Sequence, residues 1–122
     1  SGTSLVRFGI YTTDGVTATL VARTAADSTI FSSLNTSYNR ALSTTGGFPA
    51  SYTLLAGVRY AFAVIIVAST PGSVYTAFDA PPAALSSLAP RITGAYAGQT
   101  DLPTSVPSFS SSTIGVWGRL SV

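Results

Sequence analysis

Hydrophobic and polar side chains alternate with a period of two over much of the chain, a pattern typical of β-strands with one buried face. The first alternating stretch covers residues 5–24, with Asp14-Gly15 near its centre. This dipeptide tolerates the positive φ angles of a hairpin turn. Residues 5–24 are therefore predicted to form a β-hairpin, with Leu20 and Ala22 on one face of the second strand and Arg23 on the other.

The most apolar stretch, residues 58–67, predicts a different kind of strand. One of its faces carries large residues such as Phe62, and the other carries the small residues Ala61 and Ala63. A strand that is apolar on both faces is covered on both sides, so we expect it at the centre of a sheet. The small residues indicate the close approach of another layer or of a neighbouring subunit. Ala56-Gly57 predicts a turn just before this strand.

The rest of the chain divides into short elements. We expect a short helical turn at 28–34, with Asp27 as its N-cap. We expect another at 81–88, where proline occupies the first turn. About seven or eight strands at intervals of roughly ten residues favour an all-β fold, a jelly-roll-like antiparallel β-sandwich, over βαβ units. The further predicted strands are 37–43, 73–78, 91–97 and 113–122, with a long loop at 98–112.

Length and composition fit one domain. The chain has 122 residues, of which 46% are hydrophobic and 11% aromatic, enough to build a single core. Only 8% are charged, and 18 Ser and 17 Thr supply most of the polar surface. We interpret residues 1–4 as the remnant of a tag or a linker and residues 5–122 as one β-sandwich domain.

The charges restrict the possible partners. The six cations are all Arg and are spread singly along the chain, whereas nucleic-acid binding needs a concentrated basic stripe. The longest apolar run, residues 60–68, has about half the length of a membrane-spanning helix. We therefore expect neither nucleic-acid binding nor membrane insertion. A hydroxyl-rich surface without Lys or Cys suits an extracellular or virion setting.

The chain lacks the side chains that most catalytic schemes use. It has no His, Cys, Lys or Glu, which removes the common general bases, nucleophile–base pairs and zinc ligands. A glycosidase needs two carboxyl groups across a cleft. Asp14 and Asp27 have structural interpretations as a turn residue and a cap, so Asp79 and Asp101 are the pair that remains. We expect a non-enzymatic domain with no catalytic residue, no metal and no cofactor.

Two groups of residues fit the recognition of a sugar, which needs an aromatic platform beside fixed donors and acceptors. One group lies within the predicted strand 37–43, and the other lies at the mouth of the long loop 98–112. The only Trp of the chain is a further candidate platform. The candidate ligand-binding residues are Tyr38, Asn39, Arg40, Tyr96, Gln99, Asp101 and Trp117.

Each candidate also has a structural interpretation. Tyr38 and Tyr96 fit aromatic residues that pack on a sheet, and Arg40 fits a cation that pairs with an Asp or lies over an aromatic ring. Trp117 fits a core position, a subunit contact or an exposed platform. The sequence leaves these alternatives open.

Several segments resemble jelly-roll domains at the ends of bacteriophage tail fibres and minor tail proteins, especially those of phages that infect actinobacteria. The composition, rich in Ala, Gly, Thr and Arg and poor in Lys, is similar to theirs. The resemblance implies an exposed, trimeric virion domain that contacts a host-surface glycan, and it transfers no binding residue because the motifs are fold positions. The segments are Phe-Gly-Ile-Tyr at 8–11, Leu-Val-Ala-Arg-Thr at 20–24, Tyr-Thr-Leu-Leu-Ala-Gly-Val-Arg-Tyr at 52–60 and Val-Trp-Gly-Arg-Leu at 116–120.

Three functions compete. We favour recognition of host cell-surface carbohydrate by a phage tail domain. A structural, trimerising tip of a tail fibre is the second, because Ala61, Ala63 and the low charge suit a subunit interface. The third is a carbohydrate-binding module of a secreted bacterial protein.

Overall fold

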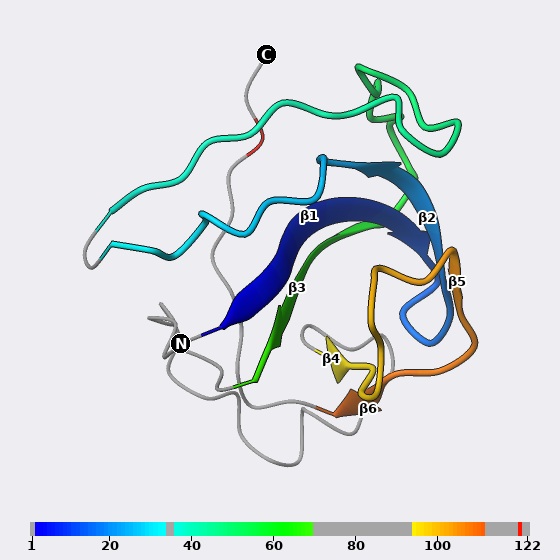
Figure 1. The fold of residues 1–122 in the computed structure, drawn as a ribbon. Coiled ribbons are helices and arrows are strands. Elements are labelled where there is room, and N and C mark those ends of the chain that lie inside the picture. Colours follow the sequence, from blue (N-terminus) through cyan, green and yellow to red (C-terminus); the bar gives the residue numbers. More distant parts are fainter. Residues whose placement is uncertain (1, 34–35, 70–93, 112–119, 121–122) are drawn as a thin grey trace.

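The computed structural model describes residues 2–33, 36–69, 94–111 and 120 of the chain. Every regular element in these ranges is a β-strand and every strand pair is antiparallel (Figure 1), so the predicted all-β antiparallel class is confirmed. These ranges contain no helix, and hence none long and apolar enough to cross a membrane. The strands are β1 (Thr3–Thr13), β2 (Ala18–Arg23), β3 (Tyr60–Ala68), β4 (Gly94–Ala95), β5 (Ser105–Val106) and β6 (Ser110–Ser111).

Strands β1 and β2 form the hairpin that the alternating pattern predicts. The Asp14 carboxylate shapes its turn by accepting hydrogen bonds from the backbone N–H groups of Val16 and Thr17, at 2.8 and 2.6 Å. Gly15 adopts a φ of 94°, which is accessible to glycine without steric cost. Strand β1 begins at Thr3, before the predicted start of the hairpin, and Thr3 pairs with Ala68 of β3.

The strands form a four-stranded sheet in the order β3-β1-β2-β5, while β4 and β6 form a separate pair. The register of the β1–β2 pair shifts between Ile10 and Tyr11, so that Val21 is an extra residue in β2. A bulge of this kind bends a strand and increases its twist. The sheet is accordingly strongly curled (Figure 1).

The bulge overturns the predicted faces of β2. Leu20 pairs with Tyr11, and Arg23 pairs with Gly9. Because Gly9 and Tyr11 are two residues apart on β1, they share a face. Leu20 and Arg23 therefore share that face as well, and Ala22 lies on the opposite one.

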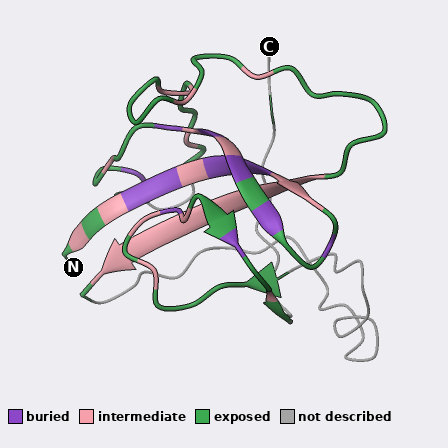
Figure 2. Ribbon diagram, turned by 90° about the vertical axis from the view of Figure 1, so that its right-hand side faces the viewer, coloured by how far each residue is buried: buried purple, intermediate pink, exposed green. Residues whose placement is uncertain are grey.

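Strand β1 lies at the centre of the sheet and is buried on both faces, whereas β3 is half-buried along its length (Figure 2). Burial on both faces gives β1 the largest share of the apolar contacts that stabilise the sheet. The inner face of β1 carries Arg7, Gly9 and Tyr11, and its outer face carries Val6, Phe8 and Ile10.

Residues 101–109 cover the inner face. Leu102 and Val106 belong to the main hydrophobic cluster there, and Ala61 and Ala63 of β3 pack against it. The small residues of β3 therefore allow another layer to approach, as predicted, and this layer comes from the same chain.

The position of β3 differs from the prediction. The apolar stretch 58–67 predicts a central strand, but in the described part of the chain β3 pairs only with β1 and lies at the edge of the sheet. Apolar residues on both faces indicate layers above and below a strand, and an edge strand can have these too. The turn at 56–57 is confirmed, with a φ of 79° at Gly57.

Two predicted elements between β2 and β3 are wrong. Residues 28–33 form bends and a turn instead of a helix, because Phe31 has a φ of 66°, outside the helical region. Ile30 is buried while Phe31 is exposed, so the two do not share one face. Residues 37–43 form no strand and contribute a single bridge, at Leu42.

The predictions for the C-terminal part are met only in part. Of the strand predicted at 91–97, the structure has β4, and the predicted loop 98–112 contains β5 and β6, each of two residues. The elements predicted at 73–78 and 81–88 lie outside the described residues, as does the strand predicted at 113–122 except for Leu120.

Residue Leu102 approaches the backbone of β1 closely at Gly9, which gives a test of the inner core. A Cβ atom at Gly9 would lie 2.6 Å from Leu102 Cδ1. Gly9→Ala should therefore overpack the cluster and lower the free energy of unfolding by about 1–3 kcal/mol in urea denaturation. In a Leu102→Ala background this loss should be clearly smaller, although a Cβ atom would still lie 3.1 Å from Leu20 Cδ1. An equal loss in both backgrounds would show that Leu102 does not pack on Gly9.

Candidate functional site

The first group of candidate residues lies against the turn that follows β2. The Tyr38 hydroxyl accepts a hydrogen bond from the Ser33 N–H at 2.7 Å. Arg40 Nε donates to Asp27 Oδ2 at 2.6 Å, and Arg40 Cζ lies 5.9 Å from the centre of the Tyr38 ring. Both structural interpretations of Arg40, the pair with an Asp and the position over a ring, are therefore confirmed. Asn39 is exposed, and its carbonyl oxygen accepts a hydrogen bond from Arg40 Nη1.

Phe31 completes this group and was not among the predicted site residues. Its ring lies 5.6 Å from that of Tyr38 and 6.4 Å from that of Phe8, both with edge-to-face geometry. The side chain is nevertheless 40% exposed. No pattern in the sequence marks Phe31, because its φ of 66° depends on these tertiary contacts. We call Asp27, Thr29, Phe31, Tyr38 and Arg40 the aromatic–arginine cluster.

The backbone of Phe31 is strained. A left-handed conformation costs a residue with a side chain about 1–2 kcal/mol, and aromatic residues seldom adopt it. Such strain persists only where the surrounding structure imposes it, and it is concentrated at functional sites. The strain here holds an apolar ring at the surface beside a cation and several hydroxyl groups.

Asp27 is the fixed anion of the cluster. Hydrogen bonds from the Thr29 hydroxyl and the Thr29 N–H, followed by that from Arg40, lower its pKa to about 2. The carboxylate thus stays charged and bonded to Arg40 under ordinary conditions. The Asp27–Arg40 pair is neutral as a unit, so the cluster offers polar groups and rings without a net charge.

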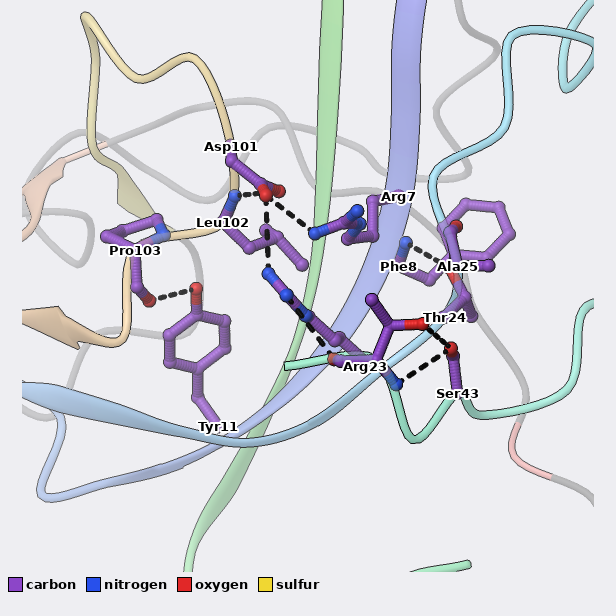
Figure 3. A network of polar contacts seen from close by, with 11 residues as sticks. Arg7, Phe8, Tyr11, Arg23, Thr24, Ala25, Ser43, Asp101, Leu102 and Pro103 are labelled. Atoms are coloured by element: carbon purple, nitrogen blue, oxygen red, sulfur yellow. Dashed lines mark hydrogen bonds and ion pairs between the residues drawn. The ribbon is translucent and has the colours of Figure 1, made fainter. Parts of the chain in front are cut away.

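The second group of candidates is not assembled in the same way. Asp101 is turned toward the inner face, where its Oδ2 accepts hydrogen bonds from Arg7 Nη1 at 2.6 Å and Arg23 Nη1 at 3.2 Å (Figure 3). Gln99 Nε2 instead donates to the carbonyl oxygen of Ala97. Tyr96 is 41% exposed.

Arg7 and Arg23 were not predicted as site residues, although their positions gave a signal. Arg7 is a charged residue within an apolar strand, and its side chain is only 8% exposed. Arg23 lies over the Phe48 ring, with Cζ 4.7 Å from the ring centre. A buried guanidinium requires a partner, and Asp101 provides it. We call Arg7, Arg23 and Asp101 the arginine–aspartate network.

Tyr11 lies next to this network. Its hydroxyl donates a hydrogen bond to the carbonyl oxygen of Pro103 at 2.7 Å (Figure 3). Burial, together with the nearby Asp101 charge, raises the pKa of Tyr11 to about 12. Tyr11 is therefore a neutral hydrogen-bond donor at any physiological pH, and with Asp101 it fastens residues 101–103 to the sheet.

The remaining candidates can be placed only in part. Trp117 and Asp79 lie outside the described residues, so the carboxyl pair Asp79–Asp101 is not seen. Within the described ranges, no three acidic side chains gather as a metal site would require.

Comparison with known proteins gives this chain no relative. No protein-family model matches it, and neither the curated proteins nor the solved structures gave a significant match. Functional inference therefore depends on the residues and their geometry.

The arginine–aspartate network predicts a large effect of one substitution. Asp101→Asn removes the counter-ion of the buried Arg7 and should lower the free energy of unfolding by about 2–4 kcal/mol, somewhat less than for a fully buried pair because Asp101 reaches the surface. Asp14→Asn, in the exposed hairpin turn, is the matched control and should lose much less. Equal losses in urea denaturation would contradict the role of Asp101.

The low pKa of Asp27 predicts a shifted carboxyl titration. NMR should place its midpoint near pH 2, compared with 3.8 for an ordinary Asp. Because folding lowers this pKa, the stabilisation is complete above about pH 4 and is lost as the pH falls through 2. Thr29→Val should raise the midpoint, since the Thr29 hydroxyl is the largest cause of the shift. An unchanged midpoint in this variant would count against that hydrogen bond.

Proposed function

We propose that the chain is a non-enzymatic recognition domain of a bacteriophage tail, which binds host cell-surface carbohydrate through the aromatic–arginine cluster. The observation that carries the proposal is Phe31, an exposed aromatic residue in a strained left-handed conformation. Strain of this kind points to a functional role.

The chemistry of the cluster suits a sugar. The apolar face of a sugar ring packs on an aromatic ring, and its hydroxyl groups need donors and acceptors at fixed positions. Phe31 and Tyr38 supply the rings, while Arg40 and Thr29 supply polar groups already held by hydrogen bonds. Because these groups are fixed before binding, little conformational entropy is lost when a ligand binds.

The wider proposal follows the resemblance to tail-fibre and minor tail proteins. It includes the jelly-roll sandwich of seven or eight strands as the complete fold, a homotrimer as the assembly, and the virion as the location. The hydroxyl-rich, weakly charged surface supports an exposed setting. A purely structural tip has less support, because Ala61 and Ala63 pack against a cluster of their own chain.

A pair of matched variants tests which candidate group binds. Phe31→Gly removes the ring but accepts the positive φ without strain, so the fold should persist. Tyr96→Ala removes an equally exposed ring from the other group. In titrations with host-envelope polysaccharide followed by NMR, Phe31→Gly should weaken binding at least about fivefold, and Tyr96→Ala should leave it unchanged.

The reverse result would move the site to the group around Tyr96. If the assembled wild-type protein binds neither host cells nor any glycan on an array, the proposed function is wrong.

A further inference from the structure

Among the described residues, the arginine–aspartate network brings two positive charges together with one negative charge. Arg7 and Arg23 both approach the same oxygen, Asp101 Oδ2, and neither forms an ion pair with another carboxylate in the described residues. Their side chains are well shielded from water, at 8% and 15% exposure. A shielded charge without a counter-ion is costly, so the site favours an additional anion.

The two guanidinium groups also have unused donors. Each carries five N–H donors in a planar fork. Within the described chain, Arg7 uses one donor on Asp101, while Arg23 uses one on Asp101 and one on the Thr45 carbonyl oxygen at 3.4 Å. Arg7 Nε is buried and has no acceptor there. Donors therefore remain for an acceptor with two or more oxygens.

The site is open on one side and fixed on the other. Asp101 is 41% exposed, so the network reaches the surface at its carboxylate. Phe48 supports the Arg23 guanidinium from one face, and Gly46 approaches it so closely that a Cβ atom there would lie 2.7 Å from Nη2. A guanidinium held in one plane is well suited to bind a planar or tetrahedral oxyanion through two donors.

We propose that Arg7 and Arg23 form a binding site for an oxyanion, which shares their donors with Asp101. A free phosphate ion and a phosphate or carboxylate group on a surface polymer present the same chemistry to this site. Arg7 points to the inner face, whereas Phe8, which contacts the aromatic–arginine cluster, points to the outer face. The oxyanion site therefore does not depend on the proposed function, and either can fail without the other.

The test is isothermal titration of the whole chain with sodium phosphate, against sodium chloride at equal ionic strength. The wild type should bind phosphate saturably. Asp101→Asn should bind it about five- to tenfold more tightly, because a competing negative charge is removed. Arg23→Gln should abolish binding. Arg59 is an exposed arginine that donates a hydrogen bond to the Asp14 carbonyl oxygen, and Arg59→Gln should leave binding unchanged.

Thermal unfolding gives a second readout. Phosphate also stabilises proteins by exclusion from their surface, but that effect does not saturate and should be alike in all variants. If Arg23→Gln does not fold, Arg23→Lys keeps the charge without the forked donors and should still weaken binding severalfold. The proposal is overturned if phosphate raises the unfolding temperature no more than chloride does in the wild type, in Asp101→Asn and in Arg59→Gln.

A further titration separates the two sources of the anion. An acidic oligosaccharide that competes with phosphate would assign the site to a group on a polymer. Binding of phosphate without such competition would assign it to the free ion.

Discussion

The fold depends on how the chain compensates a buried positive charge at Arg7. A guanidinium inside an apolar strand is destabilising unless a carboxylate reaches it, and the carboxylate that does so, Asp101, is far away in sequence. The pair therefore fixes residues 101–103 against the sheet. With that segment fixed, Leu102 packs over Gly9 and the Tyr11 hydroxyl meets the Pro103 carbonyl oxygen. The packing of the inner face follows from this one electrostatic requirement.

The two faces of the sheet have different chemistry. The inner face combines an apolar cluster with the arginine–aspartate network, and it is covered by residues from the C-terminal half of the chain. The outer face leads from Phe8 to the exposed ring of Phe31 and on to Tyr38 and Arg40. Because Arg7 and Phe8 are consecutive, the same short piece of β1 supports both. A disturbance of this part of β1 would therefore affect both faces at once.

Local patterns predicted the local structure well. The hairpin and its Asp14-Gly15 turn follow from alternation and from glycine, and the turn at Gly57 follows in the same way. The small residues of β3 correctly indicated a close layer. The predicted partners of Arg40 were right because the possible partners of a cation, a carboxylate or a ring, are few.

The errors arose where tertiary contacts decide the outcome. Residues 28–33 have a helix-compatible pattern, but the contacts of Phe31 with Phe8 and Tyr38 impose a backbone that a helix excludes. Apolarity on both faces did not distinguish a central strand from an edge strand, and among the described residues β3 pairs only with β1. The contacts of Asp101 with Arg7 and Arg23 could not be predicted, because these residues lie far away in sequence, and its ligand-binding role stays a prediction.

The extra residue in β2 has a consequence for how this sequence can change. Leu20 and Arg23 lie three positions apart yet share a face, which is possible only because Val21 interrupts the alternation. Deletion of Val21 would place Leu20 and Arg23 two positions apart, so both would keep the inner face in a regular strand, and only the bend that the bulge gives would be lost. The extra residue thus sets the curl of the sheet rather than the face on which Leu20 and Arg23 lie.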